Sequence, residues 1–156
     1  MIQKLTGSEG RTAVFAGSFD PFTRGHDDIV RRGLEIFDHI VIAIGVNASK
    51  PGAQTRAADS ATAIRRLYAD DPRVEVAVYT CLTVDFARSL GAQFLLRGVR
   101  SVKDFEYERD MADINRQLSG LETVILFSRP EFSAVSSSVV RELAAYGHDV
   151  SAFLPQ

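Results

Sequence analysis

The chain of 156 residues is 46% hydrophobic, which is enough apolar material for one core, and we expect a single domain over residues 1–156. Its 18 basic and 20 acidic residues give a net charge of -2, which argues against the broad basic surface of a nucleic-acid-binding protein, so any anion site has to be local. The single cysteine, Cys81, excludes an intrachain disulfide and a multi-cysteine metal site, and it favours the reducing cytoplasm.

The N-terminal stretch 1–11 is polar and lacks the apolar centre of a signal peptide. No run in the sequence reaches the roughly 20 apolar residues that span a bilayer. We therefore expect a protein of the cytoplasm that does not enter a membrane.

The first predicted elements are a strand, a helix and a strand. Segment 12–16 is short, apolar and followed by Gly17, as expected of a buried strand. Segment 27–37 places apolar residues on one helical face and charged residues on the other. Segment 39–46 is a nearly continuous β-branched run, typical of a strand covered on both faces. Crossovers of this kind are right-handed and join parallel strands.

The rest of the chain continues this alternation. After a loop over 47–54, the predicted order is a helix over 58–69, a strand over 74–78, a helix over 83–90, a strand over 94–96, a helix over 101–118, a strand over 123–127 and a helix over 136–146. Five strands alternating with helices predict a doubly wound, Rossmann-like α/β domain with a sheet of five parallel strands. Ligands of such domains bind beyond the carboxyl ends of the strands.

The most informative segment joins the first strand to the first helix. Gly17 and Ser18 allow the backbone to pass close to a bulky group, and Gly25 precedes an imidazole, His26, in the first turn of the helix. Backbone N–H groups at a helix start and the positive end of the helix dipole favour a phosphate there. This segment therefore predicts phosphate chemistry.

Candidate site residues, most of them polar, follow all five predicted strands at the same edge of the sheet. In strand order they are Ser18 and His26, then Lys50, then Leu82 and Thr83, then Arg97 and Arg100, and then Ser136, Ser137 and Ser138. Cations and hydroxyls dominate this set, which suits a polyanion, and it contains no Ser-His-Asp or Cys-His arrangement for nucleophilic catalysis.

Each of these residues also has a simpler interpretation. A histidine near a helix start is often a cap, a loop lysine such as Lys50 often has no function, and Ser136 can serve as an N-cap. Arg97 at the end of an apolar strand is harder to explain without function, because arginine is seldom buried without a partner. The acidic run 104–110 is typical of a solvated helix face.

Several motifs together resemble the bacterial phosphopantetheine adenylyltransferases. They are Gly17-Ser-Phe-Asp-Pro, Thr23-Arg-Gly-His26, Arg97-Gly-Val-Arg100, Asp104-Phe-Glu-Tyr-Glu108 and Val135-Ser-Ser-Ser-Val-Val-Arg141. Thr23 to His26 is similar to the T/HxGH signature of the nucleotidyltransferase superfamily, and 135–141 to its ISSxxxR-type signature. The resemblance extends from about Thr12 to Pro155.

The resemblance implies transfer of adenylate from ATP to 4'-phosphopantetheine, which gives dephospho-coenzyme A and pyrophosphate. It implies that His26, Lys50 and Arg97 are catalytic and that Ser18, Lys50, Thr83 and Arg97 bind the acceptor. The implied ATP-binding residues are Ser18, Phe19, His26, Gly98, Val99, Arg100, Glu108, Phe132, Ser133, Ala134, Val135, Ser136, Ser137 and Ser138. The family uses Mg²⁺, for which the sequence offers no dedicated protein ligands, and it assembles as a homohexamer.

Two segments depart from the family pattern. Gln54 to Asp59 stands where the family commonly has Phe-Ser/Thr-Leu-Glu-Glu-Arg, and Phe132 stands at a position that is often Trp. The alternatives left open are an adenylyl- or cytidylyltransferase acting on another phosphorylated acceptor, such as nicotinate mononucleotide or glycerol phosphate, and a nucleotide-sensing module without catalysis.

Overall fold

The computed structural model describes residues 10–156, so most of the polar N-terminal segment considered above lies outside the described residues. The elements are β1 (Thr12–Gly17), α1 (Arg24–Gly33), β2 (His39–Gly45), α2 (Ala53–Leu67), β3 (Val74–Tyr79), α3 (Thr83–Leu90), β4 (Phe94–Val99), α4 (Val102–Ser119), β5 (Glu122–Phe127), η1 (Pro130–Phe132), α5 (Ser137–Ala145) and η2 (Ser151–Phe153). Within residues 10–156, none of the helices is both long and apolar enough to cross a bilayer.

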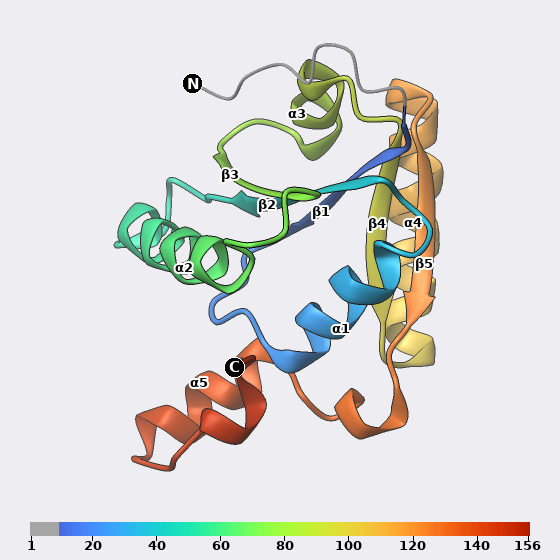
Figure 1. Cartoon of the computed structure of the whole chain (residues 1–156). Helices are drawn as coiled ribbons and strands as arrows, with labels where there is room; N and C mark the ends of the chain where they lie inside the picture. The colour runs from blue at the N-terminus through green and yellow to red at the C-terminus, as the bar shows by residue number, and fades with distance from the viewer. Residues whose placement is uncertain (1–9) are drawn as a thin grey trace.

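The five strands form one parallel sheet in the order β3-β2-β1-β4-β5. The predicted doubly wound architecture is confirmed. The first strand in the sequence, β1, lies at the centre of the sheet. The strands β2 and β3 follow outward on one side of β1, and the chain then crosses to β4 and β5 on its other side (Figure 1). The direction of winding therefore reverses between β1 and β4, which is where ligands bind in open sheets of this kind.

Alternate side chains of β1 point into two separate cores, as the two-residue period of a strand requires. Phe15 packs with residues of α1 and α2, whereas Val14 and Ala16 pack with residues of α3. Helices thus cover both faces of the sheet, while α5 lies apart from it beyond the end of β5 (Figure 1).

Several predicted boundaries were wrong. Helix α1 begins at Arg24 rather than at residue 27, because Thr23 caps it, and it ends at Gly33. Helix α2 begins at Ala53 rather than at residue 58, because Gly52 in the left-handed conformation ends the preceding turn. Strand β4 continues to Val99, so Arg97 lies within the strand and does not follow it.

Helix α2 also ends at Leu67 rather than at residue 69, whereas the remaining predicted boundaries agree with the structure to within a residue. The predicted helix over 83–90 matches α3, with Gly91 as its C-cap, and Ser136 is the N-cap of α5 as expected. The short helices η1 and η2 have no counterpart among the predicted elements.

Candidate active site

His26 is held in place by its own helix start. Its Nδ1 accepts a hydrogen bond from the backbone N–H of Thr23 at 3.0 Å, and the Thr23 hydroxyl lies 3.4 Å from the His26 backbone nitrogen, which completes a reciprocal capping box. A nitrogen that accepts a backbone N–H carries no proton, so the neutral ring carries its proton on Nε2. The imidazole is thereby fixed as a hydrogen-bond donor through Nε2.

The surroundings of His26 keep it neutral. The imidazole packs edge-on against Phe19, with 5.0 Å between ring centroids, and lies 5.4 Å from the ring of Phe22. Burial, followed by the positive charges of Arg100 and Arg97, lowers the pKa of His26 from 6.5 to about 4. Near neutral pH the side chain therefore offers a phosphate an uncharged N–H donor, and positive charge has to come from the arginines.

Arg97 on β4 forms a two-pronged ion pair with Glu108 on α4. Its Nε and Nη2 donate to the two carboxylate oxygens at 2.8 and 2.6 Å, and Nη1 donates to the backbone oxygen of Ala16. Burial disfavours the charge on Arg97, but the Glu108 carboxylate more than compensates and raises the pKa of Arg97 above its ordinary value. Three of the five guanidinium N–H donors are thus engaged, which leaves two for a ligand.

This pair corrects one expectation. The acidic run 104–110 was expected to be a solvated helix face, but Glu108 is buried, with only 7% of its surface exposed, because it balances the charge of Arg97. A charge that is paired and hydrogen-bonded in this way can be buried at tolerable cost.

A cavity of about 340 Å³ opens beside His26, and we call it the histidine cavity. It is lined by Phe15, Ala16, Gly17, Ser18, Phe19, Thr23, Gly25, His26, Ile29, Arg97, Gly98, Arg100, Ser128, Val135, Ser136, Ser137, Ser138 and Arg141. Its polar groups are N–H donors, hydroxyls and three arginines, and it has no carboxylate. This donor set suits a polyphosphate.

The start of α5 closes one side of the histidine cavity. Ser136 caps the helix by accepting from the Val139 backbone N–H at 3.2 Å, and the Ser137 hydroxyl donates to Pro21 O at 2.7 Å. The Ser137 hydroxyl is therefore occupied. The backbone N–H groups of Ser137 and Ser138 lack intrahelical partners, because they lie at a helix start, and they can donate to an anion.

A second cavity of about 370 Å³ lies on the opposite face of the sheet, under α3 and α4, and we call it the apolar cavity. Its lining residues are Val14, Ala16, Gly17, Tyr79, Leu82, Thr83, Val84, Leu95, Arg97, Tyr107, Glu108, Met111, Ala112, Ile114, Asn115, Leu118 and Thr123. The Thr83 and Tyr79 hydroxyls lie 2.7 Å apart, whereas the buried Thr123 hydroxyl has no hydrogen-bond partner among the described residues.

The two cavities share three lining residues, namely Ala16, Gly17 and Arg97. They meet at the ends of β1 and β4, where the winding of the sheet reverses. The guanidinium of Arg97 therefore faces both spaces. A group bound in one cavity and a group bound in the other can therefore come into contact beside Ala16, Gly17 and Arg97.

Not all predicted site residues line these cavities. Nine of the ATP-binding set line the histidine cavity: Ser18, Phe19, His26, Gly98, Arg100, Val135, Ser136, Ser137 and Ser138. Thr83 and Glu108 line the apolar cavity. Lys50, Val99, Phe132, Ser133 and Ala134 line neither cavity; Lys50 is exposed in the turn before α2, and Val99 is buried. The Phe132 ring instead lies 5.7 Å from the Arg24 guanidinium.

Sequence reasoning assigned no site role to several residues of the histidine cavity, among them the polar residues Thr23, Ser128 and Arg141. Thr23 was taken only as part of a motif, although its position three residues before His26 is that of a cap. Arg141 lines the cavity and donates to Asp20 O at 2.5 Å. Its place as the arginine of the ISSxxxR-type signature was the available indication.

The chain matches the cytidylyltransferase-like family model over residues 14–143. It is similar to a phosphopantetheine adenylyltransferase from Phocaeicola vulgatus, with 51% identity over 146 residues that cover 94% of this chain and 96% of the relative. It is also similar to a phosphopantetheine adenylyltransferase from Porphyromonas gingivalis, with 54% identity over 147 residues that cover 92% of this chain and 94% of the relative.

Solved structures of low sequence identity share the fold. A bifunctional NMN adenylyltransferase/ADP ribose pyrophosphatase from Francisella tularensis superposes with a TM-score of 0.64 at 14% identity, covering 93% of this chain and 44% of that chain. A lipopolysaccharide core biosynthesis protein from Thermoplasma volcanium superposes with a TM-score of 0.52 at 13% identity, covering 77% of this chain and 97% of that chain.

Proposed function

Because this chain belongs to the cytidylyltransferase-like family, and within it to the phosphopantetheine adenylyltransferases, we propose that it transfers adenylate from ATP to 4'-phosphopantetheine, giving dephospho-coenzyme A and pyrophosphate. The observation that supports this most is the junction at Arg97. One cavity suits a polyphosphate, the other suits a long and largely apolar arm, and both end at the same guanidinium.

The acceptor is assigned to the apolar cavity. The pantetheine arm lies among α3 and α4, where Thr83 and the unpaired Thr123 hydroxyl are available to its amide groups. Its phosphate reaches the junction and accepts the two remaining N–H donors of Arg97. Lys50 supplies a second positive charge from the turn after β2, which lies beside β1 in the sheet.

ATP is assigned to the histidine cavity. Its phosphates accept from His26 Nε2–H and from the backbone N–H groups of Ser137 and Ser138, while Arg100 and Arg141 supply positive charge. These groups are fixed before the substrate arrives, because the capping box holds the imidazole and Ser136 caps α5. Preorganised donors of this kind stabilise charge that develops in a transition state.

The reaction in this arrangement is an in-line displacement. An oxygen of the acceptor phosphate attacks the α-phosphorus of ATP, the bond to the α,β-bridging oxygen breaks, and pyrophosphate leaves with the electron pair. The acceptor is a phosphate monoester with a second pKa of about 6, so it is ionised without a general base. The neutral imidazole therefore acts as a donor to the leaving pyrophosphate, and catalysis consists of alignment and charge neutralisation.

Mg²⁺ fits this site only as an ion that binds together with the ATP phosphates. Among residues 10–156 there is no cluster of three His, Cys, Asp or Glu side chains that could hold an ion, and the histidine cavity has no carboxylate in its lining. The hydroxyls of Ser136 and Ser137 in the lining are already engaged in hydrogen bonds, and Mg²⁺ commonly binds through substrate phosphates and water. When bound with ATP, the ion would supply additional positive charge to the phosphates.

The oligomeric state and location form part of the same proposal. The family resemblance implies a homohexamer, and exposed apolar side chains of α4 and β5 outside both cavities offer a surface for contact between copies, among them Val102 at 76%, Phe105 at 37% and Phe127 at 65% exposure. Light scattering of the purified chain would test the number of copies. The cytoplasmic location stays a prediction from the single cysteine.

The function is tested by pyrophosphate release from the purified chain with Mg²⁺. ATP with phosphopantetheine should release pyrophosphate and yield dephospho-coenzyme A, identified by mass. CTP in place of ATP, or nicotinate mononucleotide or glycerol phosphate in place of the acceptor, should release far less. Faster release with one of these substrates would overturn the assignment. Binding of ATP without any pyrophosphate would instead favour a module that senses nucleotides.

A further inference from the structure

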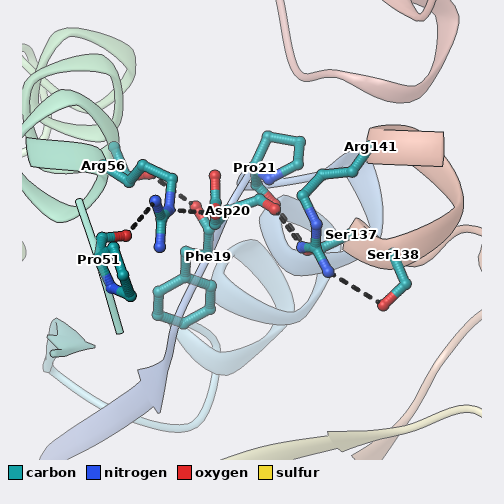
Figure 2. A network of polar contacts seen from close by, with 9 residues as sticks. Phe19, Asp20, Pro21, Pro51, Arg56, Ser137, Ser138 and Arg141 are labelled. Atoms are coloured by element: carbon teal, nitrogen blue, oxygen red, sulfur yellow. Dashed lines mark hydrogen bonds and ion pairs between the residues drawn. The ribbon is translucent and has the colours of Figure 1, made fainter. Parts of the chain in front are cut away.

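Arg56 on α2 bridges two loops that the proposed function assigns to different substrates. Its Nε lies 3.3 Å from Asp20 Oδ2, and its Nη1 donates to Pro51 O at 3.0 Å. Asp20 directly follows Phe19 in the loop of the histidine cavity, and Pro51 directly follows Lys50. Figure 2 shows the guanidinium between Asp20 and Pro51. We propose that Arg56 is a positioning residue that holds the turn carrying Lys50 in register with the loop that binds ATP.

The loop side of this bridge has other supports. Ser60 Oγ donates to Phe19 O at 2.9 Å from α2, and Ser137 Oγ donates to Pro21 O at 2.7 Å from α5. Arg141 donates to Asp20 O from the side opposite Arg56 (Figure 2). If Arg56 is removed, these three hydrogen bonds still hold the loop, so the histidine cavity should keep its shape.

The turn side of the bridge is held more weakly. Among the described residues, the other hydrogen bonds of the turn join near neighbours, such as Lys50 N–H to Asn47 O at 3.0 Å and Ala53 N–H to Lys50 O at 3.2 Å. The turn is also shaped around the guanidinium. Gly52 has a φ of +70°, and a Cβ placed there would lie 2.9 Å from Arg56 Nη1. Loss of Arg56 should therefore release the turn, and with it Lys50, while leaving the rest of the site in place.

The bridge contributes little to overall stability. The side chains of Arg56 and Asp20 are 48% and 34% exposed, and exposed pairs of this kind stabilise a fold only weakly. Arg56 also lies in the segment Gln54 to Asp59, where this chain departs from its family's pattern. The effect of the bridge is therefore on the placement of a cation rather than on the stability of the fold.

The kinetic test rests on the proposed function and compares Arg56→Ala with Arg66→Ala, which removes another exposed arginine from α2. Arg56→Ala should raise KM for phosphopantetheine about tenfold, because a misplaced Lys50 binds the acceptor phosphate less well. The KM for ATP should stay within about twofold of the wild-type value. Arg66→Ala should change neither constant. In a Lys50→Ala background, Arg56→Ala should add less than about twofold, because residues that act together are not additive. An unchanged KM in Arg56→Ala, or an equal effect in both backgrounds, would overturn the positioning role.

Hydrogen exchange of the substrate-free chain tests the bridge independently of activity. Amides of residues 47–53 should exchange about tenfold faster in Arg56→Ala than in the wild type or Arg66→Ala, while amides of β2 keep their protection. Equal exchange of 47–53 in all three proteins would overturn the bridge even if the enzyme is active. If the wild type releases no pyrophosphate, the proposed function fails. The bridge would still be supported in that case if residues 47–53 exchange faster in Arg56→Ala but not in Arg66→Ala.

Discussion

The neutral imidazole of His26 should make the folded chain sensitive to acid. The pKa of His26 is about 4 in the folded chain and 6.5 without its surroundings, so the unfolded state binds more protons between these values. The free energy of unfolding should therefore fall as the pH drops from 6.5 toward 4. Two protonation equilibria with these pKa values give a loss of about 2.5 kcal/mol at pH 4.5 relative to pH 7, as an upper limit because residue 26 as a whole is only partly buried.

The variant His26→Gln isolates this effect. Glutamine at the third helical position can still accept from the Thr23 backbone N–H and complete the capping box, but it does not titrate. Urea unfolding of both proteins at equal chain concentration, at pH 7 and at pH 4.5, gives the two free-energy differences. Carboxylates titrate alike in both proteins and cancel. The wild type should lose about 2 to 2.5 kcal/mol more than the variant. An equal loss in both would refute a neutral, buried imidazole.

Further changes test the site and the core. His26→Ala should lower kcat by about a hundredfold to a thousandfold, as expected for one preorganised donor, and circular dichroism should show an intact fold. Arg97→Ala should mainly raise KM for phosphopantetheine, and an unchanged KM in initial-rate kinetics would contradict its role. Glu108→Ala should lower the free energy of unfolding by about 2 to 3 kcal/mol in urea, because it leaves Arg97 without its partner. Gly33→Ala should cost about 1 to 3 kcal/mol in the same measurement, because its Cβ would lie 2.8 Å from Leu96 Cδ2.

The sequence predicted the fold better than the contacts within the site. Apolar runs and glycines locate every strand, because burial on both faces leaves a continuous β-branched pattern such as that of β2. The start of α1 was missed because Thr23 and His26 are polar and stabilise the helix through caps rather than through apolar periodicity. The pairing of Arg97 with Glu108 was missed because it joins a strand to a helix, and neither spacing nor composition indicates which carboxylate lies opposite the guanidinium.

The sequence predicted that Lys50 lies in a loop after a buried strand, but it did not predict where the side chain of Lys50 lies relative to the site. The turn before α2 is positioned by Arg56, which lies in a segment without any recognised motif, and by a glycine that admits its guanidinium. Whether an exposed lysine faces a site depends on such local supports, which hydropathy does not reveal.

The narrow overlap of the two cavities has a consequence for how such an enzyme can diversify. Ala16, Gly17 and Arg97 are common to both, and the remaining walls come from different helices on opposite faces of the sheet. Substitutions in α3 or α4, other than at Glu108, which holds Arg97, can thus remodel the chamber for one reactant without disturbing the cradle for the other. An inhibitor that spans the shared corner would, for the same reason, have to match two compartments whose remaining walls come from different helices.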